Sequence, residues 1–195
     1  IRGAVLLPWV IPTALSTLGW WWMFNSLYSV VNWAGISIGL MDPPGPNWLG
    51  QKYYAMSAVV AVNVWRGLPF FAITILAGLV SIPRELYEAA EADGAGAVSR
   101  FWHVTLPMLA PTFLFVGVIT MIGYFQLFVE PYVMTAGGPL RSTTSVVLLM
   151  YEEGFRWWRM GFAAAVTFVL FLVILAFLMV QLPFALRGDE TLSGR

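Results

Sequence analysis

The sequence predicts an all-α protein that crosses a membrane several times, as a polytopic helix bundle. Of its 195 residues, 59% are hydrophobic and only 10% are charged, whereas an ordinary soluble domain has about 45–50% apolar and about 25% charged residues. Four stretches approach or exceed the roughly 20 apolar residues that a spanning helix needs. So few charges cannot cover the surface of a soluble domain of this length, so part of the solvent must be lipid.

The composition also excludes several classes of function. Ten Lys and Arg residues balance ten Asp and Glu residues, so no basic surface for nucleic acid is expected. Cysteine is absent, which excludes disulfides, thiolate metal ligands and cysteine nucleophiles. With His103 as the only histidine, a zinc site of ordinary type is not expected. We therefore expect no catalytic residue, no metal and no cofactor on this chain.

The first two predicted spans both carry helix-disturbing residues. The first runs over residues 4–24 and has Pro8 and Pro12 about one turn apart. It is expected to be a kinked helix, which a bundle tolerates because neighbouring helices re-satisfy the freed backbone carbonyls. The second runs over residues 54–80, with Pro69 and two polar residues near its middle.

The last two predicted spans, over residues 107–129 and 161–186, are free of charge. No Asp, Glu, Lys or Arg lies within either stretch, which is typical of helices surrounded by hydrocarbon. Trp157 and Trp158 precede the last span, where tryptophan is typical of the membrane–water interface.

Three connections join these spans. Residues 25–53 contain the turn-forming run Asp42-Pro43-Pro44-Gly45-Pro46, and residues 130–160 contain TSVVLLMYEEGFRWWRM, which predicts a short helix at the membrane interface. With four spans, both chain ends lie on one side of the membrane, and the middle connection, residues 82–107, lies on the same side. The other two connections share the opposite side, but the basic residues divide almost evenly and do not orient the chain. We expect one domain over residues 1–195.

The connection over residues 82–107 predicts a helix–turn–helix outside the bilayer. Pro83 suits the first helical position, and Glu85 and Glu88 then lie in the early turns, where negative charge complements the helix dipole. Gly94 can take the left-handed conformation that ends a helix. A second short helix is expected from about Ala95 to His103.

Small side chains and acids dominate this elbow, which we define as residues 82–107. Its alanines and glycines allow another surface to approach the backbone closely, and Glu88, Glu91 and Asp93 offer charges for orientation. The elbow is therefore either a docking surface for a partner protein or an amphipathic interface helix without a partner. The residue types alone favour neither.

The spacing within the elbow resembles the EAA motif of permease subunits of bacterial ATP-binding cassette (ABC) importers. That motif is Glu-Ala-Ala, three residues, Gly, nine residues, an aliphatic residue, any residue, then Leu-Pro. The chain has Glu88-Ala89-Ala90, Gly94, Val104 (where Ile is commoner) and Leu106-Pro107 at these spacings.

Three further segments are similar to the carbohydrate-importing branch of that family. They are LPWVIP at Leu7–Pro12, SIPRELYEAA at residues 81–90, and FQLFVEPYVMTAGGP, which ends at Pro139. The resemblance is to the first of the two permease subunits of maltose, lactose and glycerol-phosphate importers, over residues 6–181. Family members usually have at least six spans, so we expect a preceding pair of spans in a longer protein.

The resemblance implies a permease of the bacterial cytoplasmic (inner) membrane that forms half of a pathway for a sugar or oligosaccharide. The cytoplasmic elbow would dock on one of two ATPase subunits, which carry the ATP and Mg²⁺. A second permease and an extracytoplasmic solute-binding protein facing residues 25–53 and 130–160 complete the implied assembly. The implied docking residues are Glu88, Ala89, Ala90, Asp93, Gly94, Leu106 and Pro107.

Polar residues within spans are candidates for the substrate pathway, because they are costly in lipid. Aromatic side chains are added because they can stack on the apolar face of a sugar ring. Arg66 has the alternative of pairing with a carboxylate or with backbone carbonyls inside the bundle, and Phe128 that of ordinary helix packing. Gln126 is the strongest candidate, and the full set is Asn63, Arg66, Tyr124, Gln126 and Phe128.

Two other functions remain open at this point. The same architecture serves other solutes, and the sequence does not identify the cargo. A channel or ion-coupled carrier needs acids or paired charges within the membrane, but no acid lies in the four predicted spans. Glu152 and Glu153 are adjacent, so they face different sides of any helix and are expected to be a solvated pair.

Overall fold

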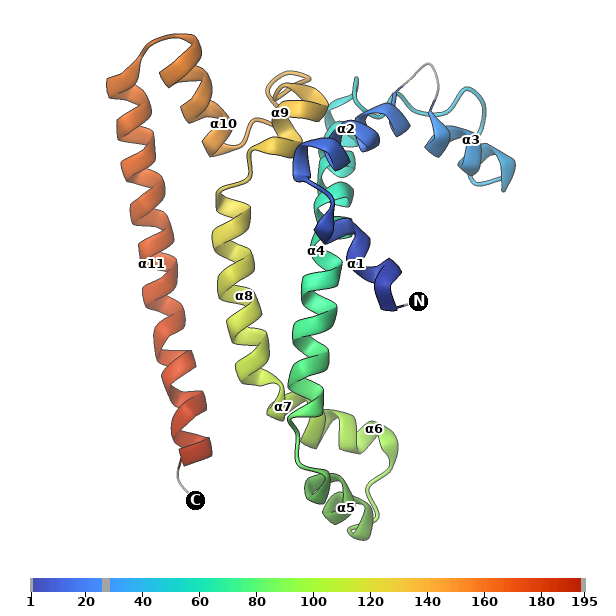
Figure 1. Ribbon diagram of the computed structural model, residues 1–195, viewed down its shortest axis with the longest axis vertical. Helices are drawn as coiled ribbons and strands as arrows, with labels where there is room; N and C mark the ends of the chain where they lie inside the picture. Colours follow the sequence, from blue (N-terminus) through green and yellow to red (C-terminus); the bar gives the residue numbers. More distant parts are fainter. Residues whose placement is uncertain (1, 26–28, 194–195) are drawn as a thin grey trace. The chain divides into compact units, whose positions relative to one another are not determined.

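The computed structural model describes residues 2–25 and 29–193, and within them the chain is helical with no β-strand (Figure 1). The all-α prediction is confirmed. The chain divides into two compact units, one of Ile1–Pro69 with Tyr124–Phe171 and one of Phe70–Gly123 with Leu172–Arg195. The helices are α1 (Arg2–Val10), α2 (Thr13–Met23), α3 (Val30–Ser37), α4 (Lys52–Val80), α5 (Arg84–Ala92), α6 (Ala97–Arg100), the π-helical η1 (Phe101–Thr105), α7 (Leu106–Met108), α8 (Ala110–Phe125), α9 (Val129–Thr135), α10 (Val146–Tyr151), the π-helical η2 (Glu152–Arg156) and α11 (Met160–Ser193).

Within the described residues, two helices are long and apolar enough to cross a bilayer. They are α4, over its full 29 residues, and Met160–Gln181 of α11. A third arises if the bent pair Ala97–Met108 and Ala110–Phe125 forms one span, with a bend of 57° between its halves. The second and fourth predicted spans are thus confirmed as continuous helices.

The first predicted span, residues 4–24, differs in the structure because it is broken into α1 and α2. The last helical bond before the break joins Ile11 N–H to the Leu7 carbonyl, at 3.2 Å. Pro12 then has φ −51° and ψ 131°, an extended conformation, and serves as the N-cap of α2. Proline has no N–H to continue the helix and disfavours the helical conformation in the residue before it. The result is two separate helices rather than one kinked one.

The third predicted span also ends earlier than expected, at Phe125 rather than residue 129. The chain leaves α8 through a turn at Gln126 and enters α9 at Val129. Two helices, α3 and α9, lie in segments that we predicted as connections. The short helix predicted in residues 130–160 is confirmed as α10, which continues into η2. The sidedness of the connections, and the treatment of residues 1–195 as one domain, stay predictions.

The core of the first unit forms where α2, α4 and α9 meet. Buried residues from the three elements, Phe24, Ala58, Val59, Val62 and Met134, form one cluster. Trp20 packs on this cluster, with its ring centroid 5.3 Å from that of Trp65. This packing fixes α9 against the first half of α4.

In the second unit, α4 and α8 approach closely at a glycine. A Cβ atom on Gly78 would lie 2.6 Å from the Thr112 hydroxyl oxygen and 2.9 Å from a Leu109 methyl carbon. Leu109 is 3% exposed and Val116 is 2% exposed. The absence of a side chain at residue 78 therefore permits the contact that joins the two helices above the elbow.

Candidate functional site

The elbow is a helix–turn–helix whose turn depends on Gly94. Helix α5 ends at Ala92, and Gly94 has φ +79°, which glycine adopts without the penalty that a Cβ brings. Gly94 N–H donates to the Glu91 carbonyl at 3.0 Å and Ala95 N–H to the Ala90 carbonyl at 2.9 Å. The predicted turn is confirmed, with Pro83 as the N-cap of α5 rather than its first residue.

Two side-chain contacts connect the arms of the elbow. The hydroxyls of Tyr87 on α5 and Thr105 on η1 lie 3.0 Å apart, and Thr105 is 9% exposed. Arg100 Nη1 donates to Glu91 Oε2 at 3.1 Å. The second arm, predicted as residues 95–103, begins at Ala97 and continues through η1 into α7. These contacts hold the turn in a defined position.

The predicted docking residues divide between two elements. Glu88, Ala89, Asp93 and Gly94 are exposed on α5 and its turn, and Ala90 is half-buried among them. Glu88 Oε1 lies 2.9 Å from Arg84 Nε one helical turn earlier. Leu106 and Pro107 lie on α7, where the chain bends towards α8. The structure therefore gathers five of the seven residues at the tip of the elbow.

Arg66 pairs with Glu130 on α9, a partner that the sequence did not identify. The two side chains form an ion pair and a hydrogen bond across 64 positions of sequence. The Glu130 side chain is 2% exposed and that of Arg66 is 29% exposed. The alternative in which Arg66 pairs with a carboxylate is confirmed. An acid directly after a long apolar run is the sequence signal that could have identified Glu130.

The other predicted pathway residues do not converge on one cavity. Asn63 Nδ2 donates to the Val59 carbonyl of its own helix, at 3.1 Å. Tyr124 is 44% exposed near the end of α8, and Gln126 is exposed in the turn that follows. Phe128 is the one member of the predicted set that lines the cavity described next.

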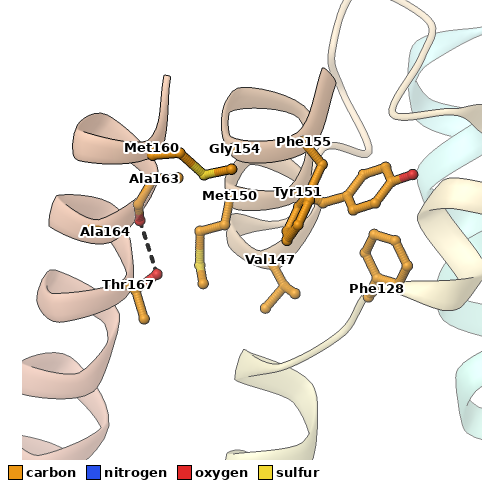
Figure 2. A pocket seen from close by; sticks show the side chains of 10 residues that line it. All are labelled: Phe128, Val147, Met150, Tyr151, Gly154, Phe155, Met160, Ala163, Ala164 and Thr167. Atoms are coloured by element: carbon orange, nitrogen blue, oxygen red, sulfur yellow. Dashed lines mark hydrogen bonds between the residues drawn. The ribbon is translucent and has the colours of Figure 1, made fainter. Parts of the chain in front are cut away.

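An aromatic cluster forms one wall of this cavity, whose volume is about 550 Å³ (Figure 2). The Phe128 and Tyr132 rings stack with centroids 5.2 Å apart, and Tyr151 packs edge-on against both, at 5.2 and 5.5 Å. A hydrogen bond with the Tyr132 side chain raises the pKa of Tyr151 above its ordinary value. The cavity is lined by Phe128, Val147, Met150, Tyr151, Gly154, Phe155, Met160, Ala163, Ala164 and Thr167.

The expectation that Glu152 and Glu153 are solvated is wrong. Their side chains are 16% and 12% exposed. Glu152 pairs with Arg141 at 3.2 Å, and Glu153 pairs with Arg159 at 2.9 Å. Arg141 and Arg159 lie in the loops before α10 and after η2, and helical spacing does not predict that they pair with these acids.

The chain matches known membrane transport proteins over nearly its whole length. A family model described as "Binding-protein-dependent transport system inner membrane component" matches residues 1–186. The chain is 36% identical over 182 residues to the trehalose/maltose transport system permease protein MalF of Thermococcus litoralis, covering 93% of this chain and 60% of that protein. It is 36% identical over 171 residues to the sulfoquinovosyl glycerol transport system permease protein SmoG of Agrobacterium fabrum, covering 88% of this chain and 54% of the relative.

A solved structure has the same fold. A chain in the crystal structure of a bacterial alginate ABC transporter, in complex with an alginate pentasaccharide-bound periplasmic protein, superposes with a TM-score of 0.78 at 26% sequence identity. The match covers 92% of this chain and 62% of that one. The chain thus spans between about half and two thirds of the length of these three proteins.

Proposed function

This chain belongs to the family of inner membrane components of binding-protein-dependent transport systems, and we propose that it forms half of the translocation pathway for a sugar or oligosaccharide in an ATP-driven importer. The names of its relatives specify trehalose and maltose, and sulfoquinovosyl glycerol. The observation that carries the proposal is the exposed elbow with Gly94 at φ +79°, because a rigid, small-residue turn between helices is a surface suited to docking.

In this function the chain itself performs no chemistry. Two ATPase subunits bind ATP and Mg²⁺, and each moves the elbow of the permease that it contacts. A second permease completes the pathway, and an extracytoplasmic solute-binding protein delivers the cargo. Rocking of packed helices between two arrangements then alternates access to the pathway, as in other domain-closure transitions.

The tip of the elbow is the surface that we assign to the ATPase. Glu88 is 62% exposed and its neighbour Arg84 is 90% exposed. Because an exposed ion pair contributes little free energy, Glu88 can leave Arg84 and pair with a basic group of another subunit. Ala89 and Ala90 let that subunit approach the backbone of α5. Leu106 and Pro107 contribute at the base, where they set the direction in which motion of the elbow reaches α8.

The docking role is tested by reversing the charge at Glu88. We expect Glu88→Lys to lower ATP-dependent uptake about tenfold or more in proteoliposomes, since the loss of one charged contact at an interface costs about 2 kcal/mol or more when it is desolvated. The local cost to α5 is below about 1 kcal/mol, because the Arg84 contact is exposed.

Glu85→Lys is the matched control, since it makes the same charge change on the exposed surface of α5, outside the motif. Uptake and ATPase retention should remain close to the wild type in this variant. Equal effects of the two substitutions would contradict a specific contact at Glu88. An intact complex that imports an amino acid or phosphate and no sugar would instead overturn the assignment of the cargo.

Gln126 is the residue that we assign to the substrate pathway with the strongest support. It is exposed in the turn between α8 and α9, four positions before the buried Glu130, and its amide can both donate to and accept from sugar hydroxyls. Asn63, Arg66, Tyr124 and Phe128 are the further members of the proposed pathway.

We expect Gln126→Ala to raise the KM for uptake about fivefold to tenfold while the complex assembles normally, because a hydrogen bond to an uncharged ligand contributes about 0.5–1.5 kcal/mol. Uptake kinetics measured over a range of sugar concentrations test this. Unchanged KM and maximal rate would remove Gln126 from the pathway, whereas a loss of assembled complex would assign it a structural role.

A further inference from the structure

The cavity between α10, η2 and the start of α11 offers little to a polar ligand. Of its ten lining residues, only Tyr151 and Thr167 have a side chain with a nitrogen or oxygen atom. The Thr167 hydroxyl donates to the Ala163 carbonyl of its own helix at 2.8 Å (Figure 2). Figure 2 shows the Tyr151 hydroxyl directed away from α11. A sugar placed here would leave its hydroxyls without partners, which is costly, so the cavity suits an apolar ligand.

The wall formed by α11 belongs to a helix with the composition of a lipid-facing span. Met160–Gln181 has a mean hydropathy of 3.0 and is only 11% buried. The small side chains of Ala163 and Ala164 on this helix do not fill the cavity, and Gly154 of η2 adds no side chain opposite them. A Cβ atom on Gly154 would lie 3.2 Å from that of Ala163. The cavity therefore adjoins a surface with the composition of one that contacts hydrocarbon.

Two arginines directly neighbour, in sequence, residues that line the cavity, and we call this border its rim. Arg156 directly follows the lining residue Phe155, and Arg159 directly precedes the lining residue Met160. The two arginine side chains are 65% and 61% exposed. Arg156 also lies over the Trp157 ring, 5.6 Å from its centroid, and Arg159 over the Phe162 ring, 5.2 Å from its centroid. The exposed part of each guanidinium group remains open to an anion from outside.

The acids that pair with these arginines lie deeper. The Glu152 and Glu153 side chains are 16% and 12% exposed, so the charge facing the surroundings is mainly that of the guanidinium groups. Trp157 and Trp158, which separate the arginines, are 61% and 76% exposed. Exposed tryptophans beside arginines are typical of the level at which lipid headgroups lie.

We propose that this cavity binds one acyl chain of an anionic phospholipid, whose phosphate contacts Arg156 and Arg159. The apolar wall along α11 receives the chain, and the charge at the rim complements the headgroup. Basic groups near a membrane attract anionic lipid, and guanidinium groups form strong charge-assisted hydrogen bonds with phosphate. This lipid site shares the lining residue Phe128 with the proposed sugar pathway, but it does not rest on the identity of the cargo.

Native mass spectrometry of the purified, delipidated transporter complex tests the proposal. Phosphatidylglycerol and phosphatidylcholine with identical acyl chains are titrated in turn. We expect one phosphatidylglycerol to bind for each copy of this chain, at least about fivefold more tightly than phosphatidylcholine. Arg156→Gln and Arg159→Gln should each weaken phosphatidylglycerol binding about fivefold. Lys52→Gln, which removes an exposed cation that does not line the cavity, should not weaken it.

A matched pair of alanine substitutions tests the acyl-chain part. Ala164 lines the cavity, whereas Ala165 is also exposed on α11 but does not line it. We expect Ala164→Phe to weaken binding about tenfold and Ala165→Phe to leave it unchanged. If Ala164→Phe prevents assembly, Arg156→Gln decides, because Glu152 then keeps its closer partner Arg141 and the apolar wall is left intact.

Three results would overturn the proposal. The first is equal binding by the Ala164→Phe and Ala165→Phe variants, and the second is equal affinity for the two lipids. The third uses a photo-crosslinking residue at position 164 of the assembled complex. Its attachment to the second permease instead of to lipid would assign the cavity to that subunit.

Discussion

Replacing Gly94 with proline is expected to abolish ATP-dependent uptake, with about a hundredfold loss of transport rate. Gly94 has φ +79° and its N–H donates to the Glu91 carbonyl. Proline is restricted to φ near −65° and has no N–H, so it loses this bond and cannot adopt the native turn. A cost of about 3 kcal/mol or more makes the native elbow a minor conformation. Uptake in proteoliposomes, and the amount of ATPase that co-purifies with the chain, measure the effect.

Two alanine substitutions separate backbone strain from loss of space. An added Cβ atom meets no atom within 4 Å at Gly94 or at Gly96, but Gly96 has φ −69°. Alanine at residue 94 incurs the left-handed penalty of about 1–2 kcal/mol, so uptake should fall about tenfold. Gly96→Ala should be close to the wild type. Similar losses at the two positions would show that the left-handed turn is not what transport requires.

The second large effect is expected at Glu130. Glu130→Ala leaves the Arg66 guanidinium, 29% exposed, without its buried partner. Removal of one member of a buried pair strongly destabilises a protein, and with Arg66 partly exposed we expect a loss of about 2–4 kcal/mol. Thermal unfolding of the purified protein in detergent, followed by tryptophan fluorescence, measures the change. The core around α2, α4 and α9 should unfold at a lower temperature than in the wild type.

A double substitution distinguishes the ion pair from simple packing. Arg66→Met combined with Glu130→Met removes both charges, and apolar replacement of a buried pair is often neutral or stabilising. Most of the lost stability should therefore return. Arg84→Ala, which breaks the exposed Arg84–Glu88 pair, should cost less than about 1 kcal/mol. A double variant no more stable than Glu130→Ala alone would contradict the role of the charges.

The buried pair also bears on the alternative of an ion-coupled carrier. Such a carrier needs an acid that exchanges a proton or binds a cation during the cycle. Glu130 is buried, but Arg66 engages its carboxylate. Glu130, which directly follows the third predicted span, is therefore held in an ion pair. This favours a structural role for it.

The elements that sequence reasoning predicted well are those governed by local rules. Helix α4 and the apolar part of α11 are uninterrupted runs of hydrophobic residues, and length with hydropathy is sufficient to identify them. The elbow follows from capping and turn preferences, with Gly94 at its left-handed position. Pro12 was expected to bend a helix, but whether a proline bends or breaks depends on what packs around it.

The sequence by itself determined that this chain is an all-α membrane protein with a glycine-hinged elbow, because hydropathy, helix length and turn chemistry act over a few neighbouring residues. Only the tertiary structure decided that Arg66 meets Glu130 on α9, that Glu152 and Glu153 are paired with arginines, and that small residues on α11 leave a cavity beside Arg159. These contacts join side chains from different elements. They form because burying a charge or an apolar surface requires a partner, and folding selects that partner by position in space, which spacing along the chain does not encode.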